Sequence, residues 1–277
     1  MINRLRTRLQ ELQSIERKAL VTFITAGDPE PDVTVPTLHA LVESGADVLE
    51  LGIPFSDPEA EGPAIQAANE RALAHGITLR RTLDMVAAFR LDDTATPVVL
   101  MGYLNSVLSM GEQAFAAAAA EAGVDGLIMV NLPPEEGQTL QQALSAVGID
   151  LIYLIAPTTT PERQGLILER CGGFVYYVSL KGITGAGNLE PRAVAQAVGA
   201  IKSRTGLPVM VGFGIKNGPS AAAVASAADG VVVGSALVSL LGADLPADVD
   251  AEQLAARRHQ AAALVAEIRA ALDSLAG

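Results

Sequence analysis

The 277-residue chain lacks tryptophan, has one cysteine and contains few aromatic residues, which make up 4% of the sequence. Without a second cysteine no intrachain disulfide can form, so Cys171 needs no role beyond packing and a reducing, cytoplasmic compartment is expected. Basic residues are also scarce, because 19 Lys and Arg stand against 31 Asp and Glu, a formal net charge of −12. Nucleic acids and anionic membranes require clustered cations, and neither is an expected partner.

Long apolar runs are missing as well, and none approaches the length of a transmembrane helix. The N-terminus interleaves Arg4, Arg6 and Arg8 with leucines, an amphipathic pattern without the uninterrupted apolar core of a signal peptide. The three histidines fall in predicted helices and lack metal-ligand spacing. No metal site is therefore expected at His39, His75 or His259.

Short apolar runs alternate with longer helical patterns along the whole chain, as in repeated βα units. Half of the residues are hydrophobic, which suits a large parallel sheet wrapped in helices. Eight runs predict strands, the number that closes a (β/α)8 TIM barrel. An open doubly wound sheet is the main alternative, because it uses the same alternation. The eight runs span residues 20–25, 48–52, 97–101, 126–130, 150–155, 174–178, 208–212 and 230–233.

Helical patterns fill the intervals between these runs and extend beyond both ends. Four of them span residues 111–122, 134–147, 161–171 and 191–204. An extra N-terminal helix over residues 2–16 is expected to cover the N-terminal mouth of the barrel, since its apolar residues recur at helical spacing. A final helix carries the core stripe Leu264, Ile268 and Leu272. No linker or charge block marks a boundary, so residues 1–277 are expected to form one barrel domain.

Glu50 is the first candidate for chemistry. It is the sole polar side chain between Val48 and Ile53. An ionised carboxylate in such a run costs several kcal/mol unless it is paired or its pKa shifts, so a structural accident is disfavoured. The alternative is a glutamate satisfied by a backbone group or an arginine.

In a βα barrel the reactive residues follow the carboxyl ends of the strands. Glu61, in the loop after the second strand, could form a proton-transferring pair with Glu50 if the two pKa values differ. The other polar candidates at strand ends are Tyr103, Asn131, Thr158 and Tyr176.

Glycine gathers in three loops, 182–185, 212–214 and 234–235, after the sixth, seventh and eighth predicted strands. The bare N–H groups of such loops are the usual phosphate site of this fold. The segment 212–214 lacks the rest of a dinucleotide fingerprint, so no nicotinamide cofactor is implied. A Schiff-base lysine would have to be Lys181 or Lys216; Lys181 is the better placed, although a solvated lysine is the simpler interpretation.

Nine motifs distributed along the chain carry a specific resemblance. They occupy residues 23–29, 50–58, 62–66, 100–103, 125–126, 132–136, 178–185, 212–215 and 234–235. With them, the chain resembles the alpha subunit of tryptophan synthase over nearly its whole length. The resemblance implies a lyase that cleaves indole-3-glycerol phosphate to indole and glyceraldehyde 3-phosphate without a metal or cofactor of its own. It also implies a pyridoxal-phosphate (PLP) beta subunit as partner, in an alpha2-beta2 heterotetramer, which receives the indole through a tunnel.

The resemblance assigns roles residue by residue. Glu50 matches the catalytic glutamate, Glu61 the second catalytic acid and Tyr176 a tyrosine beside the substrate. Residues matched to the indole pocket are Phe23 and Leu100. Asp57 matches a loop residue linked to closure and subunit communication, and Lys181 is grouped with it. The remaining substrate-binding residues, most of them at the phosphate, are Tyr103, Thr184, Gly185, Phe213, Gly214, Gly234 and Ser235.

The chain departs from the family pattern at three positions. Glu61 replaces the usual aspartate, Asn131 replaces an aspartate and Ser106 replaces a proline. An extra methylene moves a carboxylate by about an ångström, which can cost on the order of 100-fold in rate. The alternative function is therefore a catalytically impaired subunit that mainly activates its beta partner. A third hypothesis is a Schiff-base aldolase on the same barrel, using Lys181.

Overall fold

The computed structural model describes residues 3–178, 191–212, 214–246 and 249–275. Its strands form one sheet in the order β5-β4-β3-β2-β1-β9-β8-β7-β6, and the paired neighbours are parallel. The strands are β1 (Ala19–Thr25), β2 (Val48–Gly52), β3 (Val98–Gly102), β4 (Gly126–Met129), β5 (Asp150–Ile152), β6 (Leu154–Ile155), β7 (Val175–Val178), β8 (Val209–Gly212) and β9 (Gly230–Val233).

The fifth predicted strand is divided at Tyr153 into β5 and β6, which accounts for nine strands where eight were expected. β5 pairs with β4 and β6 pairs with β7, so one continuous chain segment joins the two ends of the sheet. The Tyr176 N–H also donates to the Tyr153 carbonyl at 3.2 Å. The sheet thus curls into a barrel, which confirms the predicted TIM-barrel class over the open sheet.

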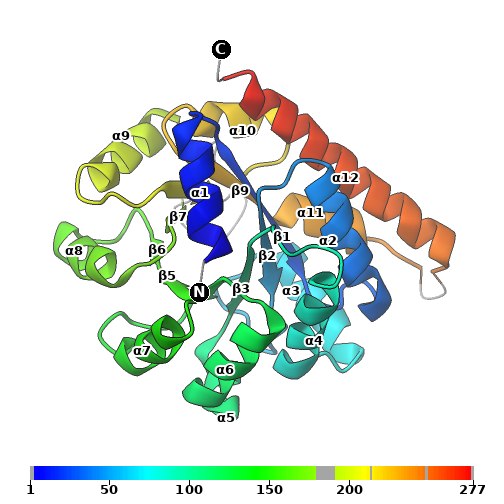
Figure 1. Cartoon of the computed structure of the whole chain (residues 1–277). Helices are drawn as coiled ribbons and strands as arrows, with labels where there is room; N and C mark the ends of the chain where they lie inside the picture. Colours follow the sequence, from blue (N-terminus) through cyan, green and yellow to red (C-terminus); the bar gives the residue numbers. More distant parts are fainter. Residues whose placement is uncertain (1–2, 179–190, 213, 247–248, 276–277) are drawn as a thin grey trace.

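Helices surround the barrel (Figure 1). They are α1 (Arg4–Ser14), η1 (Pro31–Val33), α2 (Thr34–Glu43), α3 (Pro63–Ala74), α4 (Leu79–Phe89), α5 (Leu104–Met110), α6 (Glu112–Ala122), α7 (Gln138–Ala146), α8 (Pro161–Arg170), α9 (Pro191–Lys202), α10 (Gly218–Ala225), α11 (Ser235–Gly242) and α12 (Ala251–Asp273). α12 runs along the outside of the barrel against α2, α10 and α11. Across the described ranges, no helix is both long enough and apolar enough to span a membrane.

The start of α7 differs from the sequence prediction, which placed it at residue 134. The segment around Pro134 forms a turn instead, in which the Glu136 N–H donates to the Pro133 carbonyl at 3.0 Å. A residue that precedes proline is disfavoured in the helical region, and Pro133 precedes Pro134. The helix therefore begins at Gln138, after Gly137.

Successive side chains of each strand point to opposite sides of the sheet, so one set packs against the outer helices and the other fills the barrel interior. Leu49 and Leu51 of β2 point outward and pack with the surrounding helices. Val48 points inward and packs with Val99 in the barrel interior. Because successive strand residues face opposite ways, Glu50 shares the inward face with Val48. The strand period therefore directs this carboxylate into the barrel.

The predicted extra helix is confirmed and covers the N-terminal mouth, where Figure 1 shows α1 lying across the barrel. Leu5, Leu9 and Leu12 of α1 are buried and belong to the interior cluster with Val48 and Val99. The apolar stripe of the helix therefore seals this end of the barrel with aliphatic side chains.

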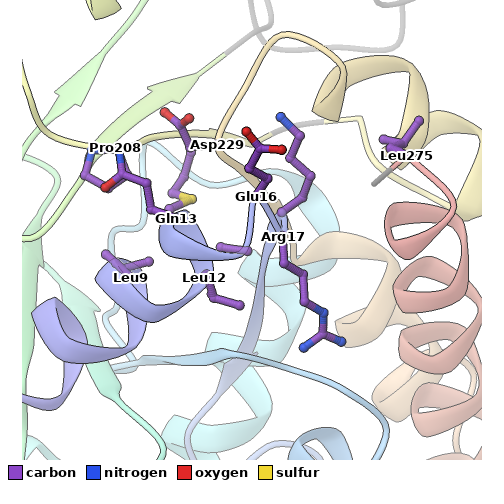
Figure 2. Close-up of a pocket in the computed structure, with 11 residues that line it drawn as sticks. Leu9, Leu12, Gln13, Glu16, Arg17, Pro208, Asp229 and Leu275 are labelled. Atoms are coloured by element: carbon purple, nitrogen blue, oxygen red, sulfur yellow. The ribbon is translucent and has the colours of Figure 1, made fainter. Parts of the chain in front are cut away.

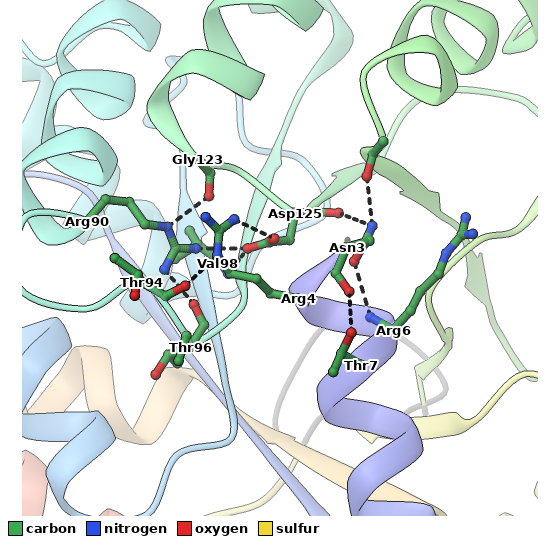
Figure 3. A network of polar contacts seen from close by, with 12 residues as sticks. Asn3, Arg4, Arg6, Thr7, Arg90, Thr94, Thr96, Val98, Gly123 and Asp125 are labelled. Carbon is green, nitrogen blue, oxygen red and sulfur yellow. Dashed lines mark hydrogen bonds and ion pairs between the residues drawn. The ribbon is translucent and has the colours of Figure 1, made fainter. Parts of the chain in front are cut away.

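Buried aspartates lie beside this seal and pair with arginines, and Figure 3 shows one of them, Asp125, with Arg4 and Arg90. Arg4 of α1 lies 3.0 Å from the Asp125 carboxylate, and Arg90 reaches its other oxygen at 2.8 Å. Arg6 pairs in the same way with Asp150. The polar residues of α1 therefore fix the helix to the starts of the strands.

A repeated backbone motif accompanies these pairs. The carboxylate of Asp47, just before β2, accepts the Leu20 N–H at 2.9 Å, and the Asp47 N–H donates to the Leu20 carbonyl at 2.8 Å. Asp125 makes the same two bonds with Val98, at 3.0 and 2.8 Å. Each aspartate satisfies an N–H at the start of the neighbouring strand, which would otherwise be buried without a partner.

Candidate active site

A cavity of about 720 Å³ opens at the carboxyl ends of the strands. Seven of the residues predicted for catalysis or substrate binding line it, although they come from six separate places in the chain. They are Phe23, Glu50, Glu61, Tyr176, Gly214, Gly234 and Ser235. Both acids and part of the glycine-rich set thus share one space, as the strand-end argument predicted.

The Glu50 carboxyl lies deep in this cavity. Its residue is 1% exposed, and its Oε2 atom is buried without a hydrogen-bond partner among the described residues. Burial raises its pKa to about 8, and the negative charge of Glu61 contributes to the rise. At neutral pH most of this group holds its proton, so it can act as a general acid. No arginine or backbone donor of the described chain satisfies Oε2, against the structural alternative.

Glu61 is also buried, at 7% exposure, and burial raises its pKa to about 7. Two side chains hold the loop that carries it. The Tyr103 hydroxyl accepts the Ala60 N–H at 3.0 Å, and the Gln66 amide donates to the Glu61 carbonyl at 2.9 Å. The carboxyl is therefore delivered to the cavity by a fixed backbone, with a pKa suited to proton exchange near pH 7.

Tyr176 completes the group of titratable residues. Burial and then the charges of Glu50 and Glu61 raise its pKa well above the usual value for tyrosine. The hydroxyl accordingly stays protonated at neutral pH and can donate a hydrogen bond. Gly212 makes room for it, because a Cβ at that position would overlap the Tyr176 hydroxyl.

The assignment of Leu100 to the indole pocket is corrected by the strand period. Leu100 is fully buried in the outer core between the strands and the helices, and it does not line the cavity. Its neighbour Met101 does, because it points inward like Val99. Phe23, the other residue assigned to the indole pocket, lines the cavity as expected.

Tyr103 and Asp57 lie on the other side of the loop that carries Glu61. The Tyr103 ring stacks on Phe55, with 4.8 Å between the centroids, and is not among the residues that line the Glu50 cavity. Both Tyr103 and Asp57 line a separate groove of about 600 Å³. Tyr103 therefore supports the loop, and Asp57 lines the groove beside it.

Asn131 lines the same groove. Its side-chain oxygen accepts the Leu104 N–H at 2.8 Å, at the start of α5. Its amide nitrogen, which an aspartate would lack, donates to Asn105 at 3.3 Å. Thr158, the remaining strand-end candidate, is exposed in the loop after β6. It does not line the cavity.

The predicted phosphate residues lie at one side of the cavity. Gly234 caps the N-terminus of α11, and Ser235 is its first residue. The first N–H groups of a helix have no intrahelical partners and favour an anion. Gly214 has a φ of 80°, a left-handed conformation that glycine adopts without strain. Lys181, Thr184, Gly185 and Phe213 lie outside the described residues.

A second cavity, of about 570 Å³, lies at the opposite end of the barrel between α1, Pro208 and Leu275 (Figure 2). Its two cations and Asp229 have partners, and the Lys18 ammonium donates to the Ala228 carbonyl at 2.8 Å. Arg17 pairs with Asp273 at 2.9 Å, and Asp229 pairs with Lys202 at 2.6 Å. In the described ranges no group of three or more His, Cys, Asp and Glu could hold a metal ion. The unpartnered acids thus favour the cavity at the carboxyl ends as the reactive site.

Comparison with known proteins identifies the family. Residues 9–270 match the family described as tryptophan synthase alpha chain. The chain belongs to this family. It is 53% identical over 272 residues to the tryptophan synthase alpha chain of Thioalkalivibrio sulfidiphilus, covering 98% of this chain and 100% of the relative. It is 52% identical over 275 residues to that of Burkholderia thailandensis, covering 99% and 98%.

Solved structures of the alpha chain family share the architecture. Tryptophan synthase subunit alpha from Legionella pneumophila aligns with a TM-score of 0.88 and 46% identity, over 99% of this chain and 100% of that one. A Mycobacterium tuberculosis tryptophan synthase chain aligns with a TM-score of 0.85 and 38% identity, over 98% and 99%. The extra N-terminal helix and the barrel are therefore features of an alpha chain fold.

Proposed function

We propose that the cavity cleaves indole-3-glycerol phosphate to indole and glyceraldehyde 3-phosphate, as expected for a tryptophan synthase alpha chain. The observation that carries the proposal is the pair of buried acids, Glu50 and Glu61, whose pKa values are raised to about 8 and about 7. Retro-aldol cleavage needs an acid at the ring carbon and an acceptor for the ring N–H, and two neighbouring carboxyls with different pKa values can supply them.

The first step is a tautomerisation of the indole ring. Glu50 in its protonated form gives its proton to C3, and the Glu61 carboxylate accepts the proton of N1. Both exchanges are feasible near pH 7, since Glu50 is mostly protonated there and Glu61 is close to half ionised. The ring carbon now has four substituents, which prepares the bond to the glycerol chain for cleavage.

The second step breaks the carbon–carbon bond. Glu50, now ionised, removes the proton of the hydroxyl on the adjacent glycerol carbon, and an aldehyde forms there as the bond breaks. The electron pair of that bond returns to the ring, and Glu61 gives its proton back to N1. Each acid ends in its starting state, and no redox partner or metal takes part.

The binding groups suit this substrate. Phe23, Ile65 and Met101 provide apolar surface for the indole, and the start of α11 provides N–H groups for the phosphate. Tyr176 supplies a neutral hydroxyl in the same cavity. The enclosed position of Glu50 keeps water away from the reacting carbon, which favours proton transfer to the ring.

We further propose a beta subunit as the partner, with an alpha2-beta2 assembly and the PLP cofactor on the beta chain. The groove lined by Asp57, Tyr103 and Asn131 supports a docking surface, because it backs onto the loop that carries Glu61. A partner that moves Asp57 would act on the same backbone that positions the Glu61 carboxyl. Binding and catalysis would then be coupled through one short loop.

The test is an indole-release assay on the chain alone and with a saturating beta subunit. Cleavage in both, faster in the complex, is the expected result. Binding to the beta subunit without any cleavage would instead indicate a subunit that only activates its partner. A Gly234→Asp variant tests the phosphate site: its carboxylate would repel the dianion and raise KM by on the order of 30-fold, whereas Leu272→Met in the outer core should leave KM unchanged.

A further inference from the structure

The charge of the substrate sets a problem for this chain. A phosphate monoester carries about two negative charges at neutral pH, the protein has a net charge of −12, and the cavity already holds Glu50 and Glu61. Long-range repulsion would slow the approach of such a ligand unless positive groups stand near the opening. Helix N–H groups alone act only within about a turn of the helix end.

Two cations line the cavity on the side of β8 and β9, and they come from different elements. Lys216 follows Gly214 in the loop after β8, and Arg257 lies in the second turn of α12. Glu50 lies on β2, two strands from β9 in the sheet order. The cations therefore belong to the part of the cavity that carries Gly234 and the start of α11.

Neither cation is neutralised within the described part of the chain. Arg257 donates one bond, at 3.5 Å, to the Leu240 carbonyl, and Lys216 has no side-chain partner there. By contrast Arg4, Arg6 and Arg90 each pair with a carboxylate. Unpaired Lys and Arg that line one cavity from separate elements suit an anionic ligand.

One acid opposes them. Asp244, just beyond α11, lines the same side of the cavity and is exposed. Its φ is 54°, a left-handed conformation that asparagine also tolerates. Asp244→Asn therefore removes a negative charge with little change in shape or backbone strain. This variant removes a negative charge on the same side of the cavity, whereas replacing Lys216 or Arg257 by glutamine removes a positive one.

We propose that Lys216 and Arg257 form a cationic rim that draws the dianionic phosphate of the substrate into the cavity and holds it beside the start of α11. The inference rests on the proposed function, and it names residues that act on substrate binding and specificity for phosphate esters. The rim lies apart from the Glu50 carboxyl, so it changes KM and leaves kcat largely unchanged.

The experiment compares Lys216→Gln, Arg257→Gln, their double variant and Asp244→Asn with a control, Arg258→Gln. Arg258 is the next residue on α12, carries the same charge and does not line the cavity. We expect each rim variant to raise KM for indole-3-glycerol phosphate about fivefold with kcat unchanged, and the double variant to raise it about 20-fold. Asp244→Asn should lower KM, and Arg258→Gln should leave it within about twofold.

Ionic strength provides a second readout. For the parent, kcat/KM should fall as salt increases, because salt screens the attraction between the rim and the phosphate. For the double variant it should stay flat or rise, since only repulsion by the acidic protein remains to be screened. If kcat/KM of the parent does not depend on salt, Lys216 and Arg257 do not attract the substrate phosphate as proposed.

Binding without turnover separates this inference from the proposed function. Calorimetry of glycerol 3-phosphate on the Glu50→Gln protein and on the same protein with the rim variants added measures phosphate affinity alone. Weaker binding in the rim variants supports the rim even if the parent never cleaves the substrate. Unchanged affinity, an equal loss in Arg258→Gln, or no binding to the parent overturns it, whatever the cleavage assay shows.

Discussion

Two buried carboxylates, Asp47 at the N-terminal mouth of the barrel and Glu50 at the other, differ in their partners. At the N-terminal mouth the Asp47 carboxylate accepts Arg8 at 2.7 Å, Arg269 at 3.0 Å and the Leu20 N–H at 2.9 Å. At the other mouth the Glu50 Oε2 atom has no partner among the described residues. Since both residues are at most 3% exposed, burial alone does not distinguish them.

The two carboxylates differ in whether ion pairs and hydrogen bonds offset the cost of burying their charge. A buried ion that is paired and hydrogen-bonded can stay charged and fix the structure, whereas an uncompensated carboxyl keeps its proton and becomes reactive near neutral pH. The N-terminal mouth thus contributes to holding the barrel together. The C-terminal mouth accepts a cost in stability, because its acids must exchange protons with a ligand.

The largest expected effect is at Glu50. Replacing it by glutamine keeps the shape and removes the exchangeable proton, so cleavage should fall about 1000-fold while the fold is retained. Single-turnover indole release with circular dichroism measures both. Glu121→Gln, on the exposed surface of α6, serves as the matched control. Residual activity above a few per cent would remove Glu50 from the mechanism.

The opposite result is expected at the N-terminal mouth. Asp47→Asn leaves Arg8 and Arg269 without their charged partner, and should lower the free energy of unfolding by about 3 kcal/mol. kcat should stay unchanged at temperatures where the variant is folded. Asp273→Asn is the control, since Asp273 also pairs with Arg269 but is more exposed and should cost under about 1 kcal/mol. Urea unfolding measures both, and equal losses would refute the distinction.

Shortening Glu61 to aspartate tests whether catalysis depends on the position of its carboxyl in the cavity. The loop is held by Tyr103 and Gln66, so Glu61→Asp should withdraw the carboxyl by about an ångström instead of moving the backbone. We expect the cleavage rate to fall by up to about 100-fold. Single-turnover rates of the parent, Glu61→Asp and Glu61→Ala with saturating beta subunit provide the comparison. Equal rates in all three would mean that position 61 has no catalytic role.

The smallest expected effect is in the pH dependence of stability. The folded-state pKa of Glu50 is about 8, above its usual value of 4.5, so folding favours the protonated form. Its contribution is fully present below pH 4.5 and is lost as the pH rises through 8. The parent should therefore lose on the order of 2 kcal/mol more than Glu50→Gln between pH 6 and pH 8. Parallel unfolding curves across that range would show that Glu50 is not strained by burial.

Much of the fold and of the catalytic pair could be predicted from local patterns. Apolar runs at strand length and leucines at helical spacing indicated the barrel and α1, because burial on one face imposes a period. Glu50 was found because it interrupts such a run, and the glycines after β8 and β9 because bare backbone suits an anion. None of these signals needs knowledge of distant contacts.

Other features were decided only by packing. The inward face of β3 depends on its pairing with β2, so nothing local showed that Met101 and not Leu100 enters the cavity. The split of a strand at Tyr153 follows from closing the barrel between β4 and β7. Both outcomes depend on the pairing register between strands that are separated in the sequence. A shift of one residue in that register would turn each side chain to the opposite face of the sheet.

The sequence likewise did not show which buried charged residues form ion pairs. Asp47 and Glu50 stand three residues apart in an apolar setting, yet only Asp47 meets arginines, one of them 222 residues away. Lys216 and Arg257 come to one cavity in the same manner, from separate elements. The sequence by itself determined which residues are buried and with what period. The tertiary structure alone decided which buried charges are paired, because ion pairs form between side chains that only the closed barrel brings together.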